Sequence, residues 1–185
     1  MSGHFRNRII FATALGLGLS AVALAGQATK AKPSGFQTVE NKHCGYWIRY
    51  PKGSQLEHPS DCALRIVLPA TGWPEWIREA TLTLYTAPPG QEPIGETPAG
   101  ESTSTSFLVA GGLKFSKTIF EDAAMSHRYI TVLYEAQGKN HKYRLQGLLT
   151  AAVPEVMDLK VKNWDPQKSA EKIFDGLALS FRALE

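Results

Sequence analysis

Two histidines and both cysteines of the chain lie close together near its first third. His43 and Cys44 are adjacent, and His58 and Cys62 follow shortly after. Thiolates and imidazoles are ligands that zinc and copper(I) accept, and a cysteine beside a basic group can be reactive. Cysteine pairs in secreted proteins most often form disulfides. These residues therefore allow three interpretations: a metal site, a pair of free or intermolecular thiols, and a disulfide.

The first 25 residues indicate the compartment in which these cysteines reside. Arg6 and Arg8 precede an apolar run that ends in Ala-Leu-Ala at residues 23–25. This pattern is typical of a secretory signal peptide, which we place at residues 1–25. An uncleaved anchor is the alternative, because the run approaches the shortest length that spans a bilayer. Cleavage removes two arginines and no acidic residue, so the formal net charge falls from +3 to +1, and no nucleic-acid partner is predicted.

A secreted or periplasmic location favours a Cys44–Cys62 disulfide over a metal held by His43, Cys44, His58 and Cys62. A plain hairpin of the two strands that follow the cysteines would separate them by about 20 Å, whereas bridged Cα atoms lie within about 7 Å. Residues 51–61 must then run back along the first strand, so that both strand starts meet. No cofactor is predicted, and the metal site remains the alternative.

The rest of the chain reads as one domain. Residues 26–35 are small and polar and predict a flexible lead, and residues 36–185 predict a single folded domain. Period-two alternation of apolar residues predicts a series of strands. These strands start at Cys44, Cys62, Glu79, Phe107, Leu113, His127 and His141. Short turns between the last three indicate an antiparallel meander.

A loop and a terminal helix complete the predicted domain. Residues 87–106 are rich in Pro, Gly, Ser and Thr, which predicts a long surface loop that is either a binding flap or a mobile connection. Asp165 can cap a helix that begins at Pro166 and keeps helical apolar spacing as far as Phe181. A weaker signal predicts a second helix at Pro154–Asp158. The predicted fold class is α+β, built on one antiparallel sheet.

The order of these segments resembles that of PsbP-like domains, a family of photosystem II extrinsic proteins and secreted bacterial proteins. The resemblance rests on an early strand "YWIRYP", a last strand "YRLQGLLTAAV", a connection with Trp164 and a terminal helix "AEKIFDGLALSFRAL". It covers about Phe36 to Leu184. It implies an α/β/α sandwich, with an antiparallel sheet of about six strands between the C-terminal helix and a second helix. It also implies a binding or assembly module and carries over no catalytic residues.

Aromatic and basic side chains offer a possible ligand surface. Its candidate residues are Trp47, Trp73, Trp76, Arg128, Lys142 and Arg144. Exposed tryptophans can stack on a sugar or a peptide, but the pair Trp73 and Trp76 is more typical of a lid over a core. The three basic residues would form a modest strip on one outer sheet face, and a solvated strand face is the main alternative.

The sequence contains no coherent catalytic set. Ser126 and His127 are adjacent, so within a strand they would point to opposite faces. Glu121 and Asp122 are likewise neighbours rather than a facing acid pair. There is no nucleophile elbow and no phosphate-binding loop. An enzyme is therefore the less favoured interpretation.

The leading hypothesis is a secreted or periplasmic, non-enzymatic binding or accessory domain for a protein or an envelope component. It would have no membrane span after signal cleavage. The first alternative is a metal-handling or thiol-redox protein that uses Cys44 and Cys62. The second is a hydrolase with a site near His127.

Overall fold

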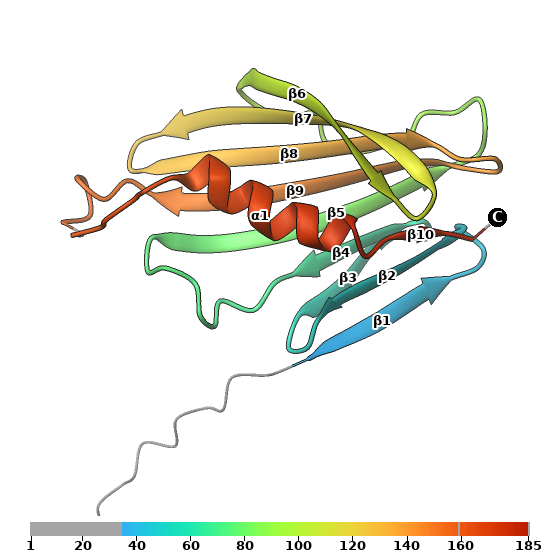
Figure 1. Cartoon of the computed structure of the whole chain (residues 1–185), viewed down its shortest axis with the longest axis horizontal. Coiled ribbons are helices and arrows are strands. Elements are labelled where there is room, and N and C mark those ends of the chain that lie inside the picture. Colours follow the sequence, from blue (N-terminus) through green and yellow to red (C-terminus); the bar gives the residue numbers. More distant parts are fainter. Residues whose placement is uncertain (1–34, 159, 185) are drawn as a thin grey trace, which may run out of the picture. The chain divides into compact units, whose positions relative to one another are not determined.

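A computed structural model describes residues 35–158 and 160–184 as ten strands and one helix (Figure 1). The predicted signal peptide, residues 1–25, and nearly all of the predicted lead, residues 26–35, lie outside this part of the chain. No helix in the described residues is long and apolar enough to cross a membrane.

Seven strands form one antiparallel sheet, in the order β3-β4-β5-β9-β8-β7-β6. They are β3 (Gln55–Ser60), β4 (Ala63–Val67), β5 (Ile77–Ala87), β6 (Glu101–Ala110), β7 (Leu113–Ala124), β8 (His127–Gln137) and β9 (Lys142–Ala152). The consecutive neighbours β7, β8 and β9 confirm the predicted meander. A smaller sheet pairs β1 (Phe36–Asn41), β2 (Tyr46–Pro51) and β10 (Arg182–Ala183), and the helix α1 is Pro166–Ala178.

The predicted α+β class with an α/β/α sandwich is wrong, because the described chain is mostly strand and contains a single helix. Residues 154–158, predicted as a second helix, form turns. The positive φ of Asp158, 52°, is incompatible with a right-handed helix at its end. In place of a second helical layer, the structure has the three-stranded sheet, which lies beside α1 on the same face of the large sheet (Figure 1).

The predicted loop 87–106 is shorter than expected, because β6 already begins at Glu101. Its segment "ESTSTS" shows no apolar alternation because both of its faces are exposed on the edge strand. Strands β1 and β3 escaped prediction for the same reason, since almost all of their side chains are exposed or half-buried. Apolar alternation reveals only strands that have one buried face.

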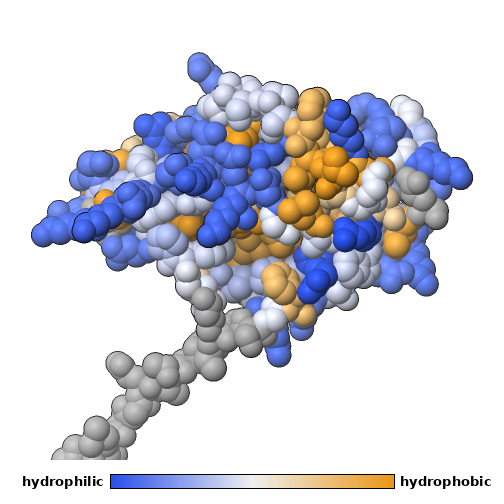
Figure 2. Space-filling model, in the orientation of Figure 1, coloured by the Kyte–Doolittle hydropathy of each residue, from blue (hydrophilic) through white to orange (hydrophobic). Residues whose placement is uncertain are grey.

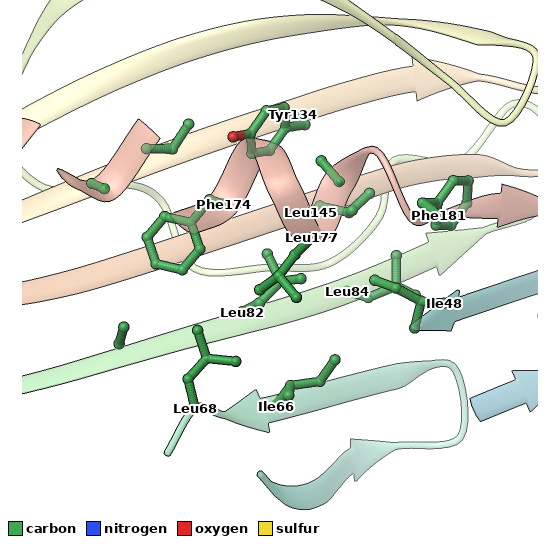
Figure 3. Packing of buried hydrophobic residues seen from close by; sticks show 14 of the residues in the cluster. Ile48, Ile66, Leu68, Leu82, Leu84, Tyr134, Leu145, Phe174, Leu177 and Phe181 are labelled. Atoms are coloured by element: carbon green, nitrogen blue, oxygen red, sulfur yellow. The ribbon is translucent and has the colours of Figure 1, made fainter. Parts of the chain in front are cut away.

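The core lies between the large sheet on one side and α1 with the small sheet on the other. Leu177 of α1 faces Leu82 of β5, and Ile48 of β2 lies near Leu84 (Figure 3). We call this face of the large sheet the inner face and the opposite face the outer face. Phe174 packs directly over Gly147 of β9, where a Cβ atom would overlap its ring. This close approach brings the helix onto the sheet.

A buried ion-pair cluster also holds α1 on the inner face. Lys117 of β7 is only 5% exposed, and its Nζ lies 2.8 Å from Glu171 Oε2 and 2.9 Å from Asp175 Oδ2. The Tyr134 hydroxyl of β8 donates a 2.6 Å hydrogen bond to Asp175 Oδ1. Glu171 and Asp175 are four residues apart and thus share one face of the helix. The cluster therefore fixes which side of α1 meets β7 and β8.

The cluster changes the pKa of its members. Burial alone would lower the pKa of Lys117, but the hydrogen bonds and charges of Glu171 and Asp175 outweigh burial and raise it above 10.5. Burial, followed by the hydrogen bond to Asp175, raises the pKa of Tyr134 well above 10.0. Burial also raises the pKa of Tyr46, which has no part in the cluster. All three groups therefore keep their protons in the folded state at alkaline pH.

Two glycine substitutions test the packing of α1. Gly147→Ala forces a Cβ into the Phe174 ring, so we expect a loss of about 1–3 kcal/mol in the free energy of unfolding. Gly176→Ala is the matched control, because nothing lies within 4 Å of its Cβ position. Alanine is the better helix former, so this variant should gain up to about 1 kcal/mol. Urea unfolding measures both, and equal effects would contradict the packing.

A pH series tests the buried cluster. The pKa values of Lys117, Tyr134 and Tyr46 are raised on folding, so their stabilisation is complete below 10.0 and is lost as the pH rises through the folded values. We expect the free energy of unfolding to fall above pH 10.0. Tyr134→Phe should lower the free energy of unfolding by about 1 kcal/mol at neutral pH. Above pH 10.0 the free energy of unfolding of this variant should fall less steeply than that of the native protein. Identical slopes for the two proteins in urea titrations would contradict this account.

Candidate functional site

Cys44 and Cys62 form the predicted disulfide, with Cα atoms 5.4 Å apart. The disulfide requires the chain to run back between the two strands that follow the cysteines, and β3 does so after β2. The cysteines therefore meet just before the starts of β2 and β4. Cys44 is fully buried. The bond joins the three-stranded sheet to the seven-stranded sheet, so it is a staple between the two sheets.

The disulfide bears on the metal alternative. The ring of His43 and the two sulfur atoms lie within 4.8 Å of one another, and His58, on exposed β3, is not part of this group. Sulfur atoms bonded to each other are not thiolates, and zinc binds the thiolate form of cysteine. A metal or redox role therefore requires prior reduction of a bond in which Cys44 is buried.

The three candidate tryptophans lie in different environments. Trp76 is 3% exposed and belongs to the core, as predicted for a lid. Trp73 is half-buried and lines an apolar groove of about 400 Å³ together with Phe36 and Ile173. Trp47 is half-buried on β2, opposite Arg182 of β10. They do not form one aromatic surface.

The three candidate basic residues each have an acidic partner. The pairs are Arg128–Glu121, Lys142–Glu92 and Arg144–Glu135. Lys142 and Arg144 share the outer face of β9. Arg128 has the parity of buried Ile130 and therefore lies on the opposite face of the sheet. A continuous basic strip is thus absent at these positions.

Ser126 and His127 contact each other, with Ser126 Oγ 3.2 Å from His127 Nδ1. The expectation that they point apart is wrong, because Ser126 lies in the tight turn before β8, next to Met125 with a φ of 51°. Within the described residues, neither side chain is hydrogen-bonded to a carboxylate, so the third member of a triad is missing.

A connection between two strands crosses the outer face. We call residues 88–100 the strap. It leaves the end of β5 and reaches β6 on the far side of the sheet from α1 (Figure 1). An ion pair between Glu92 and Lys142 holds its first part. At its other end Gly100 has a φ of 89° and packs against the backbone of Glu121, so a side chain there would overlap that backbone.

Most residues of the strap are exposed to solvent. Pro93 is the one residue of the strap that is buried. Gly95 lies against the ring of Tyr85, where a Cβ would come within 3.0 Å. Prolines at four positions stiffen the backbone. These are Pro88, Pro89, Pro93 and Pro98. The strap therefore crosses the outer face with most of its residues exposed to solvent.

Two cavities of about 310 and 280 Å³ lie between the strap and the sheet, and Glu96, Gln146 and Leu148 line both of them. The larger cavity is also lined by Pro59, Arg65, Thr81, Thr83 and Tyr85. The smaller cavity is also lined by Thr97, Pro98, Ala99, Asp122, Tyr129 and Thr131. Together the cavities have the size at which small-ligand sites occur. We call this region the strap site.

The strand register explains the floor of the strap site. Thr81, Leu148 and Thr131 form one row across β5, β9 and β8, and Thr83 and Gln146 lie in the next row. Thr81 and Thr131 are 3% and 6% exposed. Gln146 Oε1 is buried and has no hydrogen-bond partner among the described residues. Sequence reasoning missed this site, although the run of hydroxyl and amide side chains on the outer positions was its visible signal.

A second surface is apolar. On the face that carries α1, Figure 2 shows a compact hydrophobic patch within a largely hydrophilic surface, near β6 and the end of α1. Exposed apolar side chains of these elements are Phe107 and Val109 on β6 and Leu179 just after α1. The Lys114 ammonium lies 4.0 Å from the centre of the Phe107 ring. β6 is also the free edge of the large sheet.

Replacing both cysteines tests the staple. The bond closes a loop of 18 residues, so Cys44→Ser with Cys62→Ser should lower the free energy of unfolding by about 3 kcal/mol. Urea unfolding with and without reductant measures this loss. Reductant should weaken the native protein and leave the double variant unchanged, which is the control. An identical midpoint for the native protein under both conditions would show that the staple contributes nothing.

Comparison with known proteins adds little to this geometry. No protein-family model matches the sequence, and no curated protein matches it. Among solved structures, a Bacteroides thetaiotaomicron protein with a 1.50 Å crystal structure aligns with a TM-score of 0.49 and 8% identity. The alignment covers 80% of this chain and 48% of that protein, so the chain spans about half of its length. The resemblance to PsbP-like domains stays a prediction.

Proposed function

We propose that this protein is a secreted or periplasmic, non-enzymatic binding domain for an envelope component, and that it binds its ligand in the strap site. The observation that supports the proposal is the position of the strap, which spans two polar cavities instead of filling them. A ligand between strap and sheet would contact both, so that two segments distant in the sequence form one site.

The outer face does not need a cover for stability. An antiparallel sheet can leave one face in water, and the outer positions here are largely polar. A long crossing segment on such a face is therefore better explained by binding than by packing. Its ion pair with Lys142 and its close approach at Gly100 hold both ends, while Glu96 in the middle lines the cavities.

Secretion is supported by two observations. The sequence of residues 1–25 predicts a signal peptide, and the Cys44–Cys62 disulfide is typical of proteins exposed to an oxidising compartment. Cys44 of this disulfide is buried, and the bond joins the two sheets. Both observations favour a structural role over a redox role.

A non-enzymatic role is supported by the disposition of the reactive groups. Ser126 and His127 do not line either cavity of the strap site. Glu96 and Asp122 line the smaller cavity, but Glu96 is exposed on the strap, and the Asp122 carboxylate accepts a 2.8 Å hydrogen bond from the Ala123 N–H. Acid-base catalysis depends on carboxyl groups held at a fixed separation by rigid elements.

A thermal-shift screen tests the proposal with sugars, polyols, amines and organic acids. Ligands that bind the folded state raise the melting temperature, and the stabilisation grows with the logarithm of the ligand concentration above Kd. We expect at least one compound to stabilise the native protein and not Thr83→Phe, whose new ring would fill the larger cavity. Thr105→Phe is the matched control, because Thr105 is exposed on β6 and lines neither cavity.

Three results would contradict the proposal. The first is a ligand that stabilises the native protein and Thr83→Phe equally, because its site would then lie elsewhere. The second is turnover of a compound that is lost in Asp122→Asn or His127→Ala, which would make the protein an enzyme. The third is a screen without any stabilising compound, which would count against the strap site.

A further inference from the structure

We infer that the ligand of the strap site is a short, neutral oligosaccharide; this inference rests on the proposed function and specifies its ligand. The site combines hydroxyl, amide and carboxylate groups with two tyrosine rings, and it contains one large aliphatic side chain, Leu148. An apolar ligand would find too little apolar surface there, because small-molecule sites for such ligands are lined mainly by hydrophobic groups.

The charges of the site disfavour an anion. Arg65 is the basic residue that lines the cavities, and its guanidinium already lies 3.3 Å from Glu57 and 3.5 Å from Glu79. Glu96 and Asp122 add negative charge to the lining. A phosphate or carboxylate ligand would therefore face two carboxylates and an arginine that is already paired.

The buried groups point to a hydroxylated ligand. Gln146 Oε1 is a buried acceptor without a partner among the described residues, and a donor from a ligand would satisfy it. The hydroxyls of Thr81 and Thr131, on either side of Leu148, can both donate and accept. A sugar hydroxyl also donates and accepts, and it satisfies a neutral amide without the desolvation cost of an ammonium group.

The positions of Tyr85 and Tyr129 indicate the length of the ligand. Tyr85 lines the larger cavity and Tyr129 the smaller one. Their partners on β9 are Arg144 and Thr150, which are about 20 Å apart along the strand. Aromatic rings present flat apolar faces to which the C–H faces of sugar rings can bind. Two tyrosines whose strand positions are this far apart suit an oligosaccharide that lies along the site rather than a single sugar.

An NMR titration of ¹⁵N-labelled protein tests the inference. The probes are maltotriose, cellotriose and chitotriose, with spermidine and inorganic phosphate for comparison. We expect at least one trisaccharide to shift the side-chain amide of Gln146 and the backbone amides of the strap. Gln146→Leu should raise the Kd roughly three- to tenfold, because the buried acceptor is lost.

Matched variants keep the test independent of folding. Gln55→Leu makes the same change at an exposed position of β3 outside both cavities and should leave the affinity unchanged. If Gln146→Leu is unfolded, Tyr129→Leu removes one aromatic face near the start of β8 and should also weaken binding. Unchanged affinity in whichever of these two variants folds would overturn the inference.

The remaining outcomes separate this inference from the proposed function. Shifts at Gln146 with spermidine or phosphate, and none with the trisaccharides, would overturn the saccharide and keep the strap site. No shift with any probe would overturn the saccharide, and the thermal-shift screen then decides the proposed function. Cleavage of a bound trisaccharide, seen by mass spectrometry, would support the saccharide and overturn the non-enzymatic role.

Discussion

The buried ammonium group of Lys117 is the constraint on which the arrangement of the core depends. Its charge is neutralised by Glu171 and Asp175 of α1, so the side of the helix that carries these two residues must face Lys117. A buried ion pair contributes more to the choice of arrangement than to net stability, and loss of one partner leaves an unpaired charge. β10 follows α1 closely in the sequence, so the position of α1 also places β10 beside β2, where the two strands pair and complete the small sheet.

The two faces of the large sheet therefore have different roles. The inner face is closed by α1 and the small sheet, and Phe174 packs so closely on Gly147 that a Cβ atom does not fit between them. The outer face carries hydroxyl and amide side chains beneath a strap that is held mainly at its ends. Under the proposed function, stability and binding depend on opposite faces of the large sheet, because successive side chains of β5, β8 and β9 alternate between the two faces.

Sequence patterns predicted the features that depend on one buried face. The strands from residue 113 to 152 and the terminal helix follow from apolar periodicity, and the disulfide follows from the predicted compartment. The helical layer expected at residues 154–158 fails because that segment is too short and ends in a left-handed residue. The polar outer positions were visible in the sequence, but the strap site could not be located from them, because its floor joins Thr83, Gln146 and Thr131 through cross-strand register, which no local pattern encodes.

The short spacing of the two cysteines has a consequence for biogenesis. Cys62 follows Cys44 by only 18 positions, so the staple can form as soon as the first third of the chain is free to fold. The pairing of β2 with β10 and the neutralisation of Lys117 must wait for the C-terminal end. A disulfide that forms early reduces the conformational entropy of the partly folded chain. It also keeps β2 near β4 until α1 and β10 fold.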